Sequence, residues 1–255
     1  MSSLSYLDKQ NSIIVALCYY AVLPLAVAYL YLVKVWIPRK MRDRNAMCLK
    51  KTIMIYNLLQ ILMNVYIIKK CFSLMGMSLL NLWSNLCSPV SAVYTGPDVR
   101  SEIFSIVFYY NTNKVMDLLD TIFYSVRKKE SQITFLHVIH HEIALWMGWV
   151  NVFYIKDELA VRLITLNTSV HVIMYIYYFL AGIGVSAKYL WWKKYVTKIQ
   201  ILQFLAGITM LAKMMLDGCE SNLLFIVIWG VPAVFFLILF LDFYKKTYTK
   251  GHKEN

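Results

Sequence analysis

Residues 223–243 read LLFIVIWGVPAVFFLILFLDF, an apolar run with a single charged residue, Asp242. A helix needs about 20 apolar residues to cross the hydrocarbon core of a bilayer, so this run predicts a membrane span. Similar runs upstream bring the predicted number of spans to seven, and the predicted fold class is an all-α integral membrane protein. The other six predicted spans are Ile13–Val35, Thr52–Ile68, Ile103–Val126, Ile133–Val150, Leu159–Leu180 and Ile199–Leu216.

The composition agrees with a membrane protein. The chain is 60% hydrophobic and 16% charged, whereas soluble domains are about 45–50% apolar and about 25% charged. One segment, Phe72–Val93, is apolar but interrupted by polar residues, Gly76 and Pro89, and we expect a loop that could include an interfacial or re-entrant piece. The N-terminal apolar run is too long for a secretory signal and lacks a cleavage site, so we expect it to be retained.

The net charge of +12 has two interpretations. In a soluble protein it would suggest a nucleic-acid partner, whereas in a membrane protein Lys and Arg concentrate in cytosolic loops. Seven spans place 18 of the 26 Lys and Arg residues on one side and seven on the other, with Lys114 inside a span. The bias predicts a lumenal N-terminus, a cytosolic C-terminus and no nucleic-acid partner. We find no linker that would divide residues 1–255, so we expect one domain.

Four of the five histidines fall inside predicted spans, where ionisable side chains are costly and usually functional. Three of them, His137, His140 and His141, form the sequence HVIHH and share one face of a helix. A single histidine in a helix bundle is usually a hydrogen-bonded structural residue. Three histidines on one stripe instead indicate a site, and His171 in the fifth span joins this set.

The third span contains KVMDLLDT, in which Lys114, Asp117 and Thr121 share a helix face and Asp120 lies beside it. A structural ion pair between Lys114 and Asp117 is one interpretation. The other is that a carboxylate orients an imidazole from the next helix, fixing its tautomer. The sequence leaves both open.

The fifth and sixth spans also carry polar stripes. Asn167, His171, Tyr175 and Tyr178 follow one face of the fifth span, and Gln200 and Gln203 share a face of the sixth. Hydrogen bonds between helices are an equally good explanation of the two glutamines. A helix rises ~1.5 Å per residue, so the depth of each polar residue can be counted from the cytosolic end of its span. The polar stripes of four spans lie at a similar depth, which predicts one buried site open to the cytosol.

Two kinds of chemistry fit such a cluster. One metal ion with three or four histidine ligands is arithmetically possible, and membrane di-iron desaturases and hydroxylases also carry an HxxHH box. Those enzymes, however, use about eight histidines in three boxes. Histidines that act as base or nucleophile beside carboxylates and amides need no metal, and we favour this second chemistry.

Taken together, the motifs resemble those of the fatty-acid elongases, the membrane 3-ketoacyl-CoA synthases of animals and fungi. The HxxHH box of that family corresponds to residues 137–141 and its KxxExxDT motif to residues 114–121. Its NxxxHxxMYxYY motif corresponds to residues 167–178 and its TxxQxxQ motif to residues 197–203. Asp117 departs from the family pattern, which has Glu at this position, and the dilysine retrieval signal of many members is only partial in the tail.

The resemblance implies a fold in which six of the seven helices ring an acyl tunnel. It also implies a reaction: a long-chain acyl-CoA condenses with malonyl-CoA to a 3-ketoacyl-CoA two carbons longer, releasing CO2 and CoA. No metal or redox cofactor takes part. The expected location is the endoplasmic reticulum membrane, in contact with membrane lipid, with the ketoacyl-CoA reductase, dehydratase and enoyl reductase of the elongation cycle as partners. A homo-oligomer is compatible with this reading.

The resemblance also suggests roles for residues. His140 would take the acyl group, or else His140 or His141 would act only as a base. His171, Asn167 and Gln203 would hold the developing negative charge. The implied catalytic residues are His137, His140, His141, His171, Asp117, Asp120 and Lys114. The implied substrate-binding residues within the membrane are Asn167, Tyr175, Tyr178, Gln200 and Gln203. Four more lie at the cytosolic mouth: Arg127, Lys128, Lys193 and Lys194. These four could bind CoA phosphates, although the topology alone would also explain their positive charges.

The predicted topology places Cys71, Cys87 and Cys219 on the oxidising, lumenal side. We expect a disulfide between Cys87 and Cys219, which would tie the second loop across the lumenal end; a reduced pair is the alternative. Two other functions compete with condensation. One is a metal-dependent membrane hydroxylase or desaturase, and the other is a seven-helix receptor or transporter.

Overall fold

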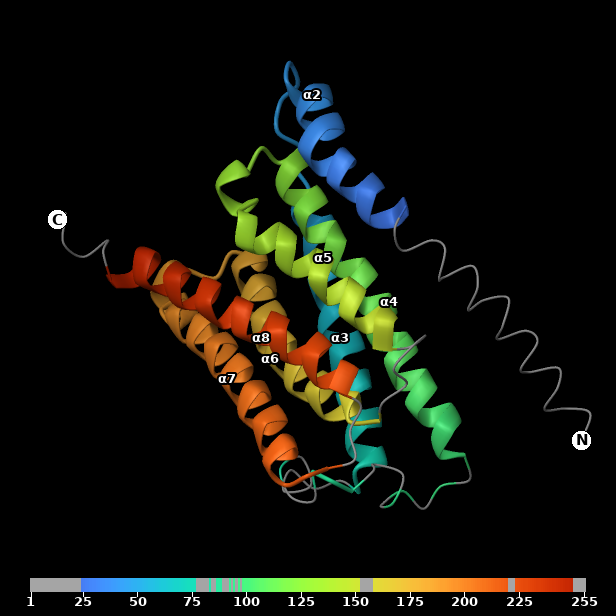
Figure 1. The fold of residues 1–255 in the computed structure, drawn as a ribbon. Helices are drawn as coiled ribbons and strands as arrows, with labels where there is room; N and C mark the ends of the chain where they lie inside the picture. The colour runs from blue at the N-terminus through green and yellow to red at the C-terminus, as the bar shows by residue number, and fades with distance from the viewer. Residues whose placement is uncertain are drawn as a thin grey trace, which may run out of the picture.

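The computed structural model describes residues 24–76, 83, 86–88, 92, 94, 96, 98–151, 158–219 and 223–249. Every regular element within these residues is helical, and no strand occurs among them (Figure 1). Residues 24–31 are helical and continue through the π-helical turn η1 (Leu32–Trp36) into α2 (Ile37–Met41). The long helices that follow are α3 (Lys50–Leu74), α4 (Val99–Val126), α5 (Phe135–Val150), α6 (Ala160–Ile183), α7 (Lys193–Leu216) and α8 (Leu223–Tyr244). Three short turns complete the set: η4 (Glu130–Gln132), η6 (Ala187–Leu190) and η7 (Lys245–Thr249).

Four stretches are long and apolar enough to cross a membrane: Lys50–Leu74, Ala160–Ile183, Ala187–Leu216 and Leu223–Thr249. Large apolar side chains on their outer surfaces are exposed, for example Leu216 at 87%. Exposed apolar surface over several helices indicates contact with lipid rather than water. The chain is therefore a multi-pass membrane protein.

All the long helices except α5, which begins at Phe135, extend further than the apolar runs from which they were predicted. α7 begins at Lys193, before the predicted start at Ile199, and α3 continues past Ile68 to Leu74. Hydropathy falls where charged residues begin, whereas backbone hydrogen bonding continues into the interfacial region, so hydropathy alone makes the helices too short. The predicted span Ile13–Val35 lies outside the described residues as far as residue 23.

α4 differs from the lipid-facing helices because its buried face is polar. Asn113, Lys114, Asp117 and Thr121 are all at most 2% exposed. Ionisable groups at membrane depth are tolerated where they face other helices and are paired. The polar face of α4 is enclosed by α3, α5 and α6, which it contacts.

Side-chain caps fix where two of these helices begin. Asp98 accepts a hydrogen bond from the backbone N–H of Ser101 at 3.2 Å, at the start of α4. Thr134 accepts one from the backbone N–H of His137, also at 3.2 Å, at the start of α5. Such caps satisfy N–H groups that have no partner within the helix. The Thr134 cap thus sets the first turn of the helix that carries the histidines.

The long helices form a closed circuit of contacts. α3 contacts α4, α4 contacts α5, α5 contacts α8, α8 contacts α7, α7 contacts α6, and α6 packs closely along α3 (Figure 1). The helices that carry the four sequence motifs are all members of this circuit. Their polar faces can therefore meet in one interior.

A disulfide joins Cys87, in the segment after α3, to Cys219, in the turn between α7 and α8. The two Cα atoms are 4.7 Å apart. Next to it, the Arg162 guanidinium of α6 donates a hydrogen bond to the backbone carbonyl of Ser88 at 3.1 Å. Together these contacts fasten the segment after α3 to the ends of three helices, on the side of the molecule opposite α2 (Figure 1). Much of Phe72–Val93 beyond α3 lies outside the described residues.

Candidate functional site

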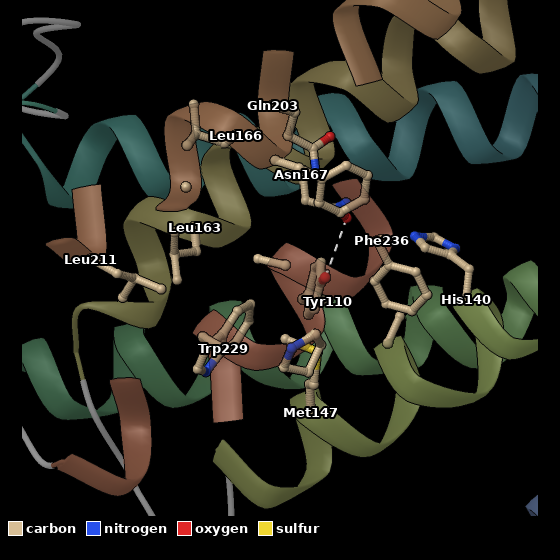
Figure 2. A pocket seen from close by; sticks show the side chains of 15 residues that line it. Tyr110, His140, Met147, Leu163, Leu166, Asn167, Gln203, Leu211, Trp229 and Phe236 are labelled. Carbon is tan, nitrogen blue, oxygen red and sulfur yellow. Dashed lines mark hydrogen bonds between the residues drawn. The ribbon is translucent and has the colours of Figure 1, made fainter. Parts of the chain in front are cut away.

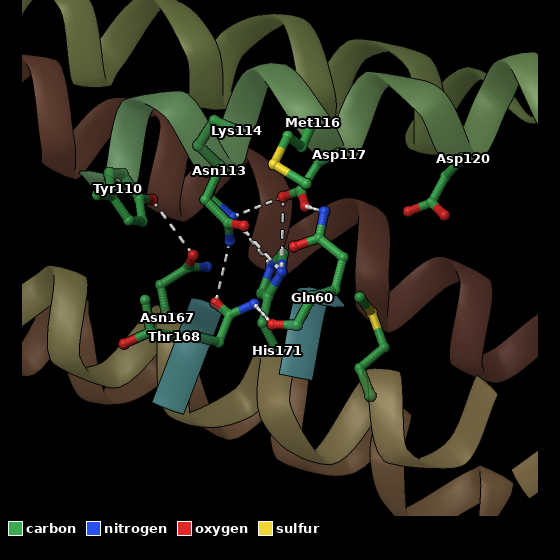
Figure 3. Close-up of polar contacts among 12 residues, drawn as sticks. Gln60, Tyr110, Asn113, Lys114, Met116, Asp117, Asp120, Asn167, Thr168 and His171 are labelled. Atoms are coloured by element: carbon green, nitrogen blue, oxygen red, sulfur yellow. Dashed lines mark hydrogen bonds and ion pairs between the residues drawn. The ribbon is translucent and has the colours of Figure 1, made fainter. Parts of the chain in front are cut away.

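An ion pair on α4 is the centre of a buried polar network. The Lys114 Nζ lies 2.9 Å from the Asp117 Oδ2, and the two side chains are 2% and 1% exposed (Figure 3). The Asp117 Oδ1 accepts hydrogen bonds from the Gln60 Nε2 of α3 and the Tyr175 hydroxyl of α6, each at 2.9 Å. Three helices therefore supply donors to one carboxylate.

The ammonium of Lys114 also faces His171 of α6. Its Nζ lies 3.4 Å from each ring nitrogen of His171, and the Asp117 Oδ2 lies 3.6 Å from the Nδ1 (Figure 3). On the other side, Lys114 lies 5.1 Å from the centroid of the Tyr110 ring, within the range of a cation–π contact. The Tyr110 hydroxyl in turn donates to the Asn167 Oδ1 at 3.2 Å. Asn167 and His171 of the fifth predicted span thus both connect to α4.

The three histidines of α5 lie on one face, as their spacing requires. The ring centroids of His137 and His141 are 4.5 Å apart, and those of His140 and His141 are 5.6 Å apart. The His137 Nε2 lies 2.9 Å from the Thr121 hydroxyl, and that hydroxyl accepts a hydrogen bond from Tyr29 at 2.6 Å. His137 is therefore held from α4 by a hydroxyl and not by a carboxylate.

His140 has an aromatic environment instead. Its ring centroid lies 5.0 Å from that of Phe236 and 6.2 Å from that of Phe240, both on α8, and 6.5 Å from that of Phe204 on α7. All three contacts are edge-to-face. The rings restrict His140 to one position without occupying either of its nitrogen atoms.

All four membrane histidines and Asp120 line one cavity of about 460 Å³. Its volume lies within the range of ~300–1,000 Å³ that is usual for ligand pockets. The wall consists mainly of polar and aromatic side chains, and α4, α5, α6, α7 and α8 all contribute to it. Other residues named from the sequence that line it are Asn167, Tyr178, Lys193, Gln200 and Gln203.

A second, narrower cavity has a volume of about 70 Å³ and a mostly apolar lining, and Figure 2 shows the side chains that form it. Leu163, Leu211 and Trp229 line its far part, between α6, α7 and α8. Its remaining wall includes four residues that line the larger cavity as well, and these mark where the two cavities meet. They are His140, Asn167, Gln203 and Phe204.

Some residues named from the sequence do not line the larger cavity. Lys114, Asp117 and Tyr175 lie behind its wall, in the network around Asp117. Lys128 donates to the backbone carbonyl of Arg42 at 3.3 Å. Arg127, the C-cap of α4, and Lys194, which lies over the Tyr195 ring, are likewise absent from the lining. Of the four basic residues predicted at the mouth, Lys193 alone belongs to the wall.

α3 also contributes to the site, although this was not predicted from the sequence. Asn57, Gln60 and Asn64 are at most 2% exposed, and Gln60 and Asn64 are hydrogen-bonded to side chains of α4. Their spacing of i, i+3 and i+7 within an apolar run was a usable signal, since it puts three amides on one helix face. Among the described residues, no group of three or more His, Cys, Asp or Glu side chains is arranged to hold a metal ion.

The comparisons with known proteins agree with these motifs. Residues 15–255 match the family described as ELO, GNS1/SUR4. The chain is 35% identical to "Very long chain fatty acid elongase 7" of Rattus norvegicus over 88% of its length and 79% of the relative's. It is 34% identical to "Very long chain fatty acid elongase 4" of Homo sapiens, over 90% and 72% of the two chains.

A third relative, "Very long chain fatty acid elongase AAEL008004" of Aedes aegypti, is 34% identical over 89% of this chain. The match spans 62% of that relative's length. The matched family covers nearly all of the sequence and includes all four motifs and both cavities. The chain belongs to the GNS1/SUR4 family, ELO.

Proposed function

We propose that this protein is a very-long-chain 3-oxoacyl-CoA synthase, an acyltransferase that condenses a long-chain acyl-CoA with malonyl-CoA. The products are CO2, CoA and a 3-ketoacyl-CoA two carbons longer. The observation that carries the proposal is the position of His140, where a polar cavity meets an apolar one. An acyl thioester has the same division, because an apolar chain and a polar CoA moiety meet at the reactive carbonyl.

In this scheme the acyl chain occupies the apolar cavity, and the thioester carbonyl lies at His140. His140 attacks that carbon as a nucleophile, and Asn167 and Gln203, which line both cavities, donate amide N–H groups to the developing oxyanion. The edge-to-face rings around His140 leave its nitrogen atoms available for this attack. The alternative, in which His140 or His141 acts only as a base, uses the same cavity.

The apolar cavity must widen before a long acyl chain can bind. Its volume of about 70 Å³ lies well below the ~300–1,000 Å³ of ordinary ligand pockets. Phe204 and Phe236, which flank His140 and line this cavity, are the side chains best placed to move. Substrate binding would then separate α7 from α8 locally, and the circuit of six helices would enclose an acyl tunnel.

The same proposal gives the protein seven membrane spans, with a lumenal N-terminus and a cytosolic C-terminus. The charge bias of the loops supports this orientation, and so does the disulfide, which requires an oxidising compartment at its end of the molecule. We place the protein in the endoplasmic reticulum membrane, where a ketoacyl-CoA reductase, a dehydratase and an enoyl reductase would process its product. Lys193, in the cavity wall, would bind a CoA phosphate.

The condensation needs no metal or redox cofactor, and this separates it from the hydroxylase or desaturase alternative, which the family does not favour. The test uses purified protein, radiolabelled malonyl-CoA and acyl-CoAs of increasing length, with a metal chelator present. Wild-type protein should form a labelled 3-keto product two carbons longer, and His140→Ala should form none. Folded wild-type protein that gave no product across the whole series would refute the proposal.

A further inference from the structure

The hydroxyl of Tyr175 lies between two carboxylates. It is 2.9 Å from the Asp117 Oδ1 and 2.8 Å from the Asp120 Oδ2. All three side chains are buried, with exposed fractions of 0% for Tyr175, 1% for Asp117 and 7% for Asp120. At these distances each carboxylate shares a hydrogen with the hydroxyl, because two facing oxygen atoms without a hydrogen between them repel each other.

A tyrosine hydroxyl has one hydrogen, so it can donate to only one of the two carboxylates. The nearby Tyr56 hydroxyl, 3.3 Å from that of Tyr175, lies 3.2 Å from the carbonyl oxygen of Met116, to which it can donate its own hydrogen. The second short contact at Tyr175 therefore requires a hydrogen on a carboxyl group. One of the two aspartates must be a neutral carboxylic acid that donates to the tyrosine oxygen.

The surroundings decide which aspartate holds the proton. Asp117 forms an ion pair with the Lys114 ammonium and also accepts a hydrogen bond from Gln60. Both contacts stabilise its negative charge. Within the described part of the chain, no Lys, Arg or His side chain lies within ion-pair distance of Asp120. A second buried carboxylate with no cation at ion-pair distance would be costly at membrane depth, whereas a neutral acid is not. Lys114, ionised Asp117 and protonated Asp120 together carry no net charge.

Asp120, unlike Asp117, also lines the cavity that contains the histidines. We infer that Asp120 is a neutral carboxylic acid and is the catalytic proton donor of this cavity, delivering its proton to the sulfur of the departing CoA. This inference rests on the proposed condensation. It assigns to Asp120 a chemical step in place of the orienting role that the motif suggests.

The reaction consumes one proton in each turnover, and a neutral Asp120 can supply it. When His140 attacks the acyl thioester, a C–N bond forms, the C–S bond breaks and the electron pair remains on sulfur. Asp120 transfers its proton to that thiolate and CoA leaves as the thiol. Malonyl-CoA then loses CO2, and the electron pair of the broken bond forms the new C–C bond to the acyl carbon, which releases neutral His140. Water in the cavity returns a proton to Asp120, so one turnover consumes one proton.

Infrared spectroscopy tests the protonation state without any turnover. Purified wild-type protein should show a carboxylic-acid C=O stretching band that shifts in D2O and is missing from Asp120→Asn. The matched control is Asp217→Asn, since Asp217 is 41% exposed and paired with Lys213 at the far end of α7. This control should keep the band. Enzymatically active wild-type protein with no band assignable to Asp120 would overturn the inference and leave the proposed function intact.

A kinetic measurement tests the proton transfer itself. In Asp120→Asn the amide N–H2 can still donate to Tyr175, so the network is kept while the transferable proton is lost. The release of free CoA thiol with both substrates present should slow by about 10²–10⁴-fold, the usual contribution of general acid catalysis, with KM for acyl-CoA little changed. CoA release by Asp120→Asn at the rate of Asp217→Asn would overturn the inference. Wild-type protein that formed no 3-ketoacyl-CoA would instead overturn the proposed function, and the role of Asp120 with it.

Discussion

Thr121 on α4 connects Tyr29 of the first helix to His137 of α5. Its hydroxyl accepts a hydrogen bond from Tyr29 at 2.6 Å and lies 2.9 Å from the His137 Nε2, to which it can donate its own hydrogen. A hydroxyl serves both partners at once because it has one hydrogen and two lone pairs. When Thr121 donates to His137, the Nε2 is the acceptor and the ring proton lies on the Nδ1.

Thr121→Val should therefore disturb His137 with little change in shape. The valine fills the same space but loses the hydrogen bonds to both Tyr29 and His137. The bond to His137 alone, at about 0.5–1.5 kcal/mol, corresponds to a fall in kcat of up to about tenfold. Thr121→Ser, which keeps the hydroxyl, should be close to wild type. Steady-state kinetics of the three proteins check this, and equal kcat values for the valine and serine variants would contradict it.

Gln60→Leu should weaken the network around Asp117. The Gln60 amide donates to the Asp117 Oδ1 at 2.9 Å from a fully buried position on α3, and hydrogen bonds to charged groups contribute about 1.5–3 kcal/mol. We expect a lower thermal unfolding temperature in detergent and a lower kcat, because Asp117 also holds Lys114 beside His171.

Thr209→Val serves as the control for Gln60→Leu. Thr209 is exposed and its hydroxyl bonds only to the carbonyls of its own helix, so its loss should have little effect. If Gln60→Leu unfolds at the same temperature as this control and retains wild-type activity, Gln60 does not support the site.

The position of most of the site can be predicted from the sequence, because the spacing of polar residues along one helix is a local property. The spacing of His137, His140 and His141 alone puts them on one face of α5, and the stripe from Asn167 to Tyr178 does the same on α6. Helical periodicity is a property of consecutive residues, so it can be read without knowing the neighbours. The shared depth of the stripes then predicts that they line one cavity, as His171 and the α5 histidines do.

Contacts between helices could not be predicted in the same way. Nothing within α4 indicates that Thr121, and not a carboxylate, would hold His137, since this depends on the rotation of α4 against α5. Gln60 joins the network because α3 packs along α6 and beside α4, a pairing that no single helix specifies. Arg127, Lys128 and Lys194 were predicted at the cytosolic mouth, but the charge of a residue does not fix the direction of a flexible side chain near a helix end.

The disulfide makes a prediction about stability under reducing conditions. It closes a long loop, and disulfides that close long loops commonly stabilise proteins by about 2–4 kcal/mol. Reductant should lower the unfolding temperature of the wild-type protein. It should have no effect on Cys87→Ser/Cys219→Ser, because the remaining described cysteines, Cys48 and Cys71, are free. An unfolding temperature of wild-type protein that does not respond to reductant would count against a stabilising role.

Gly148 leaves no room for a larger residue while Asn111 keeps its present conformation. A Cβ atom built at Gly148 of α5 would overlap the Asn111 Oδ1 of α4, so the buried Asn111 side chain would have to turn away. Gly148→Ala should therefore destabilise the protein by about 1–3 kcal/mol, as overpacking does. Asn111→Ala in the same protein should recover much of the loss. Gly230→Ala is the control, since its Cβ would make an ordinary contact, 3.7 Å from Leu211; equal unfolding temperatures for the two glycine variants would refute the steric argument.

Gly207 should control how much acyl chain the apolar cavity can hold. It lies on α7 in the wall of that cavity, and a Cβ atom there would be 3.6 Å from the Leu163 Cδ2 on the facing wall. Gly207→Leu would fill this space, so the longest acyl-CoAs should lose turnover while shorter ones keep it, with Gly207→Ala in between. The control is Gly182→Leu, because Gly182 faces Met54 of α3 and lines neither cavity. The length of the products formed by each variant from a series of acyl-CoAs measures the effect. A uniform loss of turnover at every chain length would instead mean that Gly207 acts on the reaction centre and not on the chain.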